Sequence, residues 1–159
     1  MLYNPDTKQL RKSFLLKKGG DLVFDETLDT SSFYGVYLFT PQLDEYVRNT
    51  LAAIENKLFD KTPSGGSPRY EHDNYFLTDE KYLGNPWILT TLWLAQYYIK
   101  NGQKDRAVGI IDWALSKATP SGMLSEQVNP ETGTAVGVLP LVWSHSTLAE
   151  TLLMLAQEK

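Results

Sequence analysis

The 159-residue sequence contains no cysteine, which excludes a disulfide scaffold, a thiol nucleophile and a thiolate metal site. It also lacks any run of about 18 apolar residues, so we expect neither a membrane-spanning helix nor a membrane partner. The chain does not open on a basic segment followed by an apolar one, and a secretory signal is therefore not expected. This last absence favours a cytoplasmic location.

Positive charge is scarce as well. The 15 lysines and arginines stand against 19 aspartates and glutamates, which gives a formal net charge of -4. Nucleic-acid-binding proteins usually carry a basic stripe, and because none is visible here no nucleic-acid partner is expected. His72 and His145 are too far apart to form a zinc motif, and the aspartates and asparagines do not alternate as in a calcium loop. We predict no metal site and no cofactor.

Aromatic residues are the most prominent feature of what the sequence does contain. With 42% apolar and 21% charged residues the composition is globular, and 12% of the residues are aromatic. Aromatic rings either fill a core or stack on flat ligands such as sugar rings, and core packing is the more general use. Trp93 and Trp113 fall in the middle of predicted helices, so we expect them in the core.

The first 28 residues differ from the rest of the chain. Turn residues at Asn4-Pro5-Asp6 and Lys17-Lys18-Gly19-Gly20 predict a short β-hairpin or an extended segment over 1–28. From 29 onward the periodicity is helical, and Asp29 lies where it can cap a short helix over 33–39. Thr40-Pro41 and Asn85-Pro86 each look like an N-cap followed by a proline in the first turn. The longer helices are predicted over 41–58, 87–100, 104–117 and 144–157.

The predicted helices are of two kinds. The helix over 87–100 is apolar almost all round, whereas that over 104–117 has one wet side. Long loops over 61–84 and 119–142 come directly before the predicted helices over 87–100 and 144–157. Loops of this length are often functional. An α/α barrel, with a buried inner ring and a half-exposed outer ring, has this pattern. A plain helical bundle is the alternative, although it normally uses shorter connections.

The loops contain the candidate functional side chains. Glu126 is the best single candidate for a catalytic group, and a solvated surface glutamate is its alternative. Arg69 offers a fork of donors for hydroxyls or carboxylates, or else forms an ion pair within its loop. Trp87 and Trp143 begin helices beside loops and are either sugar-stacking platforms or buried packing residues. Ser125 lacks a Gly-x-Ser-x-Gly elbow, so serine-hydrolase chemistry is not supported.

Four short segments together resemble a known family. Arg69-Tyr70, Gly84-Asn85-Pro86-Trp87, Ser125-Glu126-Gln127 and Trp143-Ser144-His145 are similar, in order and approximate spacing, to the C-terminal part of family 15 glycoside hydrolases. This is the family of glucoamylases, glucodextranases and some trehalases. The resemblance runs from about Asp25 to the last helix, and the combination is more specific than any one segment.

The resemblance implies an all-α fold, a partial (α/α)6 toroid preceded by the short hairpin or extended segment. It implies a six-hairpin glycosidase that degrades polysaccharides by inverting hydrolysis, releasing glucose from the non-reducing ends of α-glucans or gluco-oligosaccharides. Glu126 aligns with the general base that activates water. The resemblance assigns substrate binding to Arg69, Tyr70, Trp87 and Trp143. Gln127 and His145 are neighbours of these residues, without a defined role.

One departure from the family matters. The family's general acid lies upstream of the Arg-Tyr segment. No candidate for this acid in the present chain lies in a sequence that resembles the family's acid segment; the candidates are Asp29, Asp44, Glu45, Glu71 and Asp73. We therefore expect 1–159 to be a single partial domain, with its helices in 29–159, that is inactive alone. Helix 87–100 is expected to be half uncovered. Its partner would be the missing N-terminal half of the barrel or a second copy of the chain.

Two other functions remain open from the sequence. The chain is alternatively a non-catalytic glucan-binding or regulatory domain, as the regulatory subunits of phosphorylase kinase carry domains of this type. If the resemblance is set aside, a further alternative is a helical interaction domain whose acidic loop is merely solvated. The Ser-Glu-Gln segment around Glu126 favours the enzyme over both.

Overall fold

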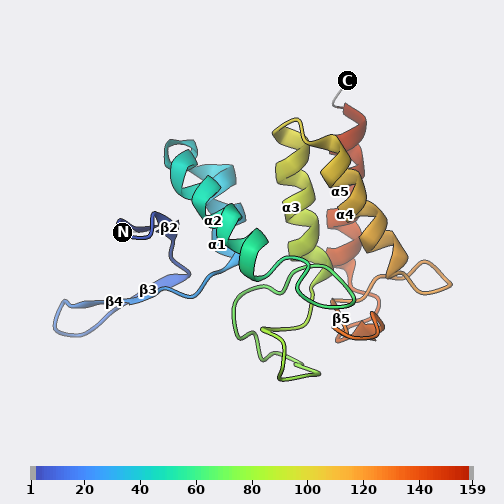
Figure 1. The fold of residues 1–159 in the computed structure, drawn as a ribbon, viewed down its shortest axis with the longest axis horizontal. Coiled ribbons are helices and arrows are strands. Elements are labelled where there is room, and N and C mark those ends of the chain that lie inside the picture. Colours follow the sequence, from blue (N-terminus) through green and yellow to red (C-terminus); the bar gives the residue numbers. More distant parts are fainter. Residues whose placement is uncertain (1–2, 158–159) are drawn as a thin grey trace.

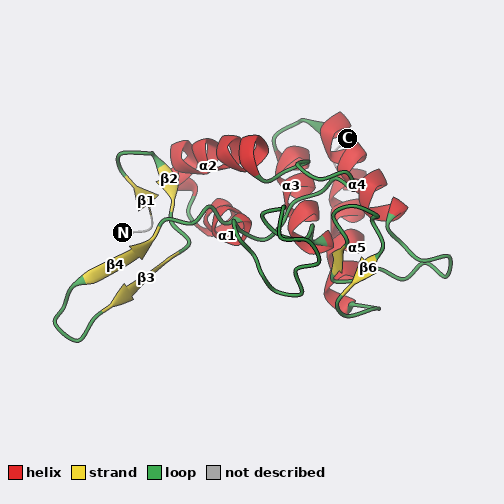
Figure 2. Ribbon diagram, turned by 60° about the horizontal axis from the view of Figure 1, so that its bottom comes forward, coloured by secondary structure: helices red, strands yellow, loops and turns green. Residues whose placement is uncertain are grey.

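The computed structural model describes residues 3–157, so Met1 and Leu2 of the predicted extended segment lie outside the described residues. Two antiparallel hairpins come first, β1 (Tyr3–Asn4) with β2 (Gln9–Leu10) and β3 (Ser13–Leu16) with β4 (Leu22–Asp25). Figure 2 shows both hairpins at one end of the molecule, with β3–β4 projecting away from the helices. Helices form most of the remaining regular structure, so the prediction of an all-α fold with an N-terminal hairpin is confirmed.

Helices α1 (Thr30–Phe39) and α2 (Asp44–Lys57) form the first antiparallel pair. Asp29 caps α1 as predicted, since its carboxylate accepts from the Ser32 N–H at 2.8 Å. Thr40 occupies the N-cap position with Pro41 in the first turn, as predicted, but its side chain makes no cap hydrogen bond, and this turn, Pro41–Leu43, is a 3-10 helix before α2.

Helices α3 (Ile88–Lys100), α4 (Lys104–Ser116) and α5 (Val142–Gln157) pack side by side (Figure 1). Helix α3 contacts α1, α4 and α5, and eleven of its thirteen residues are buried, in line with its apolar sequence. The prediction that helix 87–100 is half uncovered is therefore wrong, because its neighbours within this chain already enclose it. Trp93 stacks on Tyr34 of α1 but is only partly buried, as is Trp113 of α4, so neither is the full core residue predicted.

The loops over 58–87 and 117–141 gather at the end of the helices where α3 and α5 begin (Figure 1). The second loop contains a small hairpin that the sequence did not predict, β5 (Gln127–Val128) with β6 (Ala135–Val136). The sequence motifs all lie in or next to these loops, so the fold brings them to one end of the molecule. Over residues 3–157, no helix is both long enough and apolar enough to cross a membrane.

Candidate active site

The loop between α2 and α3 folds back on the start of α3. The Trp87 N–H donates to the Ser67 carbonyl at 2.9 Å, which fixes the loop just before Arg69. Gly84 sits at a φ of +151°, where a Cβ would come within 2.9 Å of the Pro68 Cβ and 3.0 Å of the Asp73 Cβ. Glycine is therefore required where these two parts of the loop cross.

Arg69 is the centre of a compact polar and aromatic cluster. Its Nε and Nη2 donate to the two carboxylate oxygens of Asp73, each at 2.8 Å, and Asp73 is 1% exposed. The guanidinium also lies 4.1 Å from the Trp87 ring centre and 5.2 Å from that of Tyr75. The bidentate hydrogen bonds that Arg69 donates to Asp73 raise the pKa of Arg69, and the charge of Glu126 adds to that effect.

This geometry realises the ion pair that was one of the two interpretations of Arg69. Two of its donor nitrogens are committed to Asp73, so the fork as a whole does not face a ligand. Nη1 makes no hydrogen bond within residues 3–157, and the charge of Glu126 contributes to the raised pKa of Arg69. Arg69 can therefore act on a ligand through one nitrogen and through its charge. Both carboxylate oxygens of Asp73 accept hydrogen bonds from Arg69, so Asp73 is not available as a catalytic group.

Trp87 connects Arg69 to the Glu126 loop. Its backbone pairs with Gln127 in an isolated antiparallel bridge, and the next N–H, of Ile88, donates to the Glu126 carbonyl at 3.2 Å. The Trp87 side chain is 4% exposed, which matches its packing interpretation, yet its indole N–H has no hydrogen-bond partner within the described residues. Such a buried unpaired donor is unusual, because burying it costs free energy unless a ligand or water accepts its proton.

Glu126 lies in the turn that leads into β5. Its N–H donates to the Val138 carbonyl at 2.9 Å, which holds the start of the turn against the chain beyond β6. Its carboxylate oxygen Oε2 is buried and has no hydrogen-bond partner within residues 3–157. Gly137 makes room for this carboxylate, since a Cβ there would lie 2.4 Å from Oε2. Glu126 is thus a half-buried carboxylate with a free oxygen, close enough to the Arg69 cluster to influence its charge.

Asn85 was missed as a site residue because its place before Pro86 suggested a helix cap. The structure contradicts that prediction, because α3 begins at Ile88 and Asn85 is buried. Its amide nitrogen donates to the Gln127 Oε1 at 2.9 Å and to the Phe76 carbonyl at 2.8 Å, and its oxygen accepts from Thr78. Asn85 therefore ties the Arg69 loop to the Glu126 loop, while the buried Gln127 Nε2 has no partner among residues 3–157.

The remaining predicted residues occupy the edges of the site. Tyr70 is half-buried beside Arg69, at 5.1 Å from ring centre to guanidinium, and burial raises the pKa of its hydroxyl. His145 accepts from the Leu124 N–H at 3.0 Å through Nε2, so it braces the segment before Glu126. Trp143 lies in the first turn of α5 and is 60% exposed, so the structure does not enclose it with Arg69 and Trp87.

Known proteins related to this chain are glycosidases. No protein-family model matches it. The sequence is 35% identical to an uncharacterized glycosyl hydrolase of Methanocaldococcus jannaschii, covering 77% of this chain and 21% of that protein. It is 31% identical to a protein named trehalase 2 of Sulfolobus acidocaldarius, covering 88% of this chain and 22% of the relative. The chain thus spans about a fifth of the length of the curated relatives it matches.

The fold is also shared with glucoamylases. A bacterial glucoamylase solved in complex with acarbose superposes with a TM-score of 0.71 at 23% identity, over 92% of this chain and 23% of the glucoamylase. The helices described above therefore form part of an α/α toroid, which confirms the predicted architecture. By this fold and by its glycosidase relatives, the chain belongs to the family-15-like glycoside hydrolases of the glucoamylase and trehalase type.

Proposed function

We propose that this chain supplies the general base and part of the sugar-binding crater of an inverting glycoside hydrolase. The enzyme would release glucose from the non-reducing ends of α-glucans or gluco-oligosaccharides. The observation that carries the proposal is the buried, unpaired Oε2 of Glu126, beside the positive charge of Arg69. A carboxylate that activates water needs a free lone pair, and Oε2 of Glu126, unpaired within the described residues, offers one.

Substrate binding would involve the groups that lack partners around Glu126. The indole N–H of Trp87 and the Nε2 of Gln127 are buried donors without acceptors within the described residues, and sugar hydroxyls or water are suitable acceptors. Arg69 and Tyr70 form the adjoining wall. Trp143, exposed at the start of α5, would contact sugar only once further chain covers it.

The general acid would come from outside this chain. Inverting hydrolysis needs a second carboxyl roughly 6.5–9.5 Å from the base, with a water between them. Asp73, in the Arg69 cluster, is 1% exposed and bonded to that arginine through both oxygens. We infer that 1–159 is a single partial domain, the C-terminal portion of the barrel, and that the N-terminal portion or a second copy of the chain covers its exposed apolar side chains.

A chimaeric enzyme tests the role of Glu126. This chain replaces the matching segment of the Sulfolobus relative, and glucose release is measured from trehalose, maltotriose and isomaltotriose. Glu126→Gln is expected to lower turnover by about 10²–10⁴-fold with little change in binding, because general-base assistance is of that size. Glu80→Gln, which changes an exposed glutamate within the loop over 58–87, is the matched control and should leave turnover unchanged.

Near-normal turnover of the Glu126→Gln chimaera would contradict the assignment of the base. A folded but inactive unmodified chimaera that still binds gluco-oligosaccharide would instead favour the non-catalytic, glucan-binding alternative. In that case Glu126→Gln should weaken binding.

A further inference from the structure

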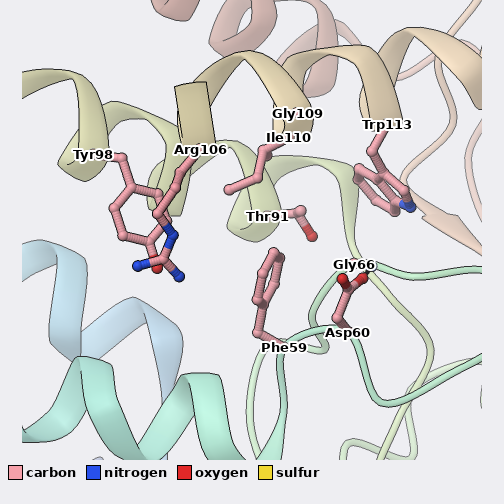
Figure 3. A pocket seen from close by; sticks show the side chains of 9 residues that line it. All are labelled: Phe59, Asp60, Gly66, Thr91, Tyr98, Arg106, Gly109, Ile110 and Trp113. Atoms are coloured by element: carbon pink, nitrogen blue, oxygen red, sulfur yellow. Dashed lines mark hydrogen bonds between the residues drawn. The ribbon is translucent and has the colours of Figure 1, made fainter. Parts of the chain in front are cut away.

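A cavity lies outside the cluster of Arg69, Trp87 and Glu126. It has a volume of about 320 Å³ and is bordered by α3, α4 and the loop after α2 (Figure 3). Neither Arg69 nor Glu126 lines it. The volume is at the lower end of the range of about 300–1,000 Å³ that small-molecule sites occupy.

Aromatic rings form much of the wall. Phe59 and Trp113 both border the cavity, and Figure 3 shows Phe59 between Arg106 on one side and Asp60 on the other. The Trp113 indole N–H donates to the Ser64 carbonyl at 2.7 Å, which fixes the ring in place. Rigid aromatic surfaces of this kind pack against the apolar C–H face of a sugar ring.

The polar groups of the cavity carry opposite charges. Asp60 accepts from the Gly66 N–H through Oδ1 at 3.2 Å, and its Oδ2 takes no hydrogen bond within residues 3–157. Arg106 lies over the Tyr98 ring at 4.1 Å and donates to Glu55 through Nη2. Carboxylates and guanidinium groups both bind hydroxyls well. Arg106 is already paired with Glu55, and Asp60 is a carboxylate with one unpaired oxygen, so a neutral hydroxylated ligand fits better than an anion.

Gly109 keeps the cavity open. It lies within α4, where glycine is a poor helix former, and it lines the cavity. A Cβ built on it would meet no atom within 4 Å, so the protein has space for a side chain that it does not carry. A larger residue here would extend into that space without disturbing the backbone.

We propose that this cavity is a second carbohydrate site, which binds one pyranose ring of a gluco-oligosaccharide outside the active site. The aromatic walls would contact the apolar face of the ring, and Asp60 and Arg106 would bind its hydroxyls. The site would hold a glucan chain on the outer surface while its end is hydrolysed elsewhere. The inference rests on the proposed function only in the choice of a gluco-oligosaccharide as the ligand.

Nuclear magnetic resonance of the ¹⁵N-labelled 159-residue chain tests the proposal, because each indole N–H gives its own signal. Titration with maltotriose is expected to shift the Trp113 signal to saturation. Gly109→Leu should abolish this shift by filling the cavity, whereas Gly109→Ala, the matched control, should retain it. The indole N–H signal of Trp87 reports independently on the candidate active site. Absence of binding in the cavity is therefore distinguishable from absence of binding at the candidate active site.

A second variant tests the polar contact. Asp60→Asn keeps an oxygen for the Gly66 N–H and suits the backbone, since Asp60 has a φ of +60°, where asparagine is tolerated. It removes the carboxylate charge, so maltotriose should bind about tenfold more weakly. The proposal is overturned if maltotriose leaves Trp113 unmoved, if Gly109→Leu responds like the unmodified chain, or if Asp60→Asn binds equally well. It is also overturned if cyclohexanol shifts Trp113 as strongly as the sugar does.

Discussion

At the scale of single residues, the position of Glu126 depends on Gly137. The glycine has a φ of +75°, and its missing side chain is the space that the Glu126 carboxylate occupies. The sequence motifs singled out Glu126, Arg69 and Trp87 as candidates, because each belongs to a segment with a distinctive neighbour. They could not identify Gly137, since a glycine in a loop rich in glycine and proline carries no sign of what it faces.

Gly137→Ala should therefore displace the Glu126 carboxylate. The alanine Cβ would lie 2.4 Å from Oε2, and we expect turnover of the chimaera to fall at least tenfold. The left-handed backbone alone should cost about 1–2 kcal/mol of stability. Gly122→Ala is the control, because Gly122 has a φ of +80° and no atom within 4 Å of the added Cβ. Equal turnover in the two variants would contradict the proposed contact.

Asp29 should make stability depend on pH. Burial raises the pKa of this carboxyl above its ordinary value of 3.8, although the Ser32 N–H partly offsets the effect. The folded chain then binds the proton more tightly than the unfolded chain, so stability should fall as pH rises from 3.8 through the raised pKa.

Asp29→Asn keeps an N-cap and removes this titration. Urea unfolding across the acid range should show the fall for the unmodified chain and a smaller fall for the variant. Asp6→Asn, at an exposed site, should behave like the unmodified chain. A variant with an unchanged pH slope would show that Asp29 is not the responsible group.

At the scale of elements, the helices were predictable, but the way they are capped was not. The apolar periodicity located α2 to α5 to within a few residues, but Thr40 makes no side-chain cap and the predicted Asn85 cap of α3 is absent. Before α3, Asn85 uses its side chain to join two loops instead of capping a helix, and this long-range use is invisible in a local pattern. The β5–β6 hairpin escaped notice because strands of two residues show no alternation.

Gly109 lowers the stability of α4. Gly109→Ala should stabilise the chain by about 0.5–1 kcal/mol, because alanine is the better helix former and the new Cβ meets no atom within 4 Å. Gly102→Ala provides the contrast, since Gly102 follows α3 at a φ of +73° and alanine is strained there. Thermal unfolding of both variants checks the opposite signs, and a loss of stability in Gly109→Ala would contradict the description of α4.

At the scale of the whole molecule, the exposed apolar surface lies elsewhere than the sequence suggested. Helix α3 is enclosed, whereas large apolar side chains are exposed on α5 and just before it, among them Val142 at 79% and Leu153 at 62%. Hydrophobicity along one helix indicates that it is buried, but it does not indicate which neighbours bury it. The exposed side chains are the surface that we propose a further part of the barrel, or a second copy, covers.

Leu153→Lys should separate association from folding. The side chain is exposed, so the stability of the chain alone should change by less than about 0.5 kcal/mol. Sedimentation of the unmodified chain should show self-association that Leu153→Lys weakens. Asn56→Lys, which adds the same charge to the exposed side of α2, should not. An unmodified chain that stays monomeric would exclude a second copy as the partner.

The central claim, that Glu126 is the base of an inverting reaction, is tested most directly by the anomer of the glucose first released. Proton magnetic resonance of the chimaera, acting on whichever of the three sugars it hydrolyses, follows this product before it equilibrates. A base that activates water across the ring predicts β-glucose from the non-reducing residue of maltotriose or isomaltotriose, and equal amounts of α- and β-glucose from trehalose; Glu126→Gln should slow their appearance. Release of the non-reducing residue as α-glucose, or of α-glucose alone from trehalose, would contradict the account.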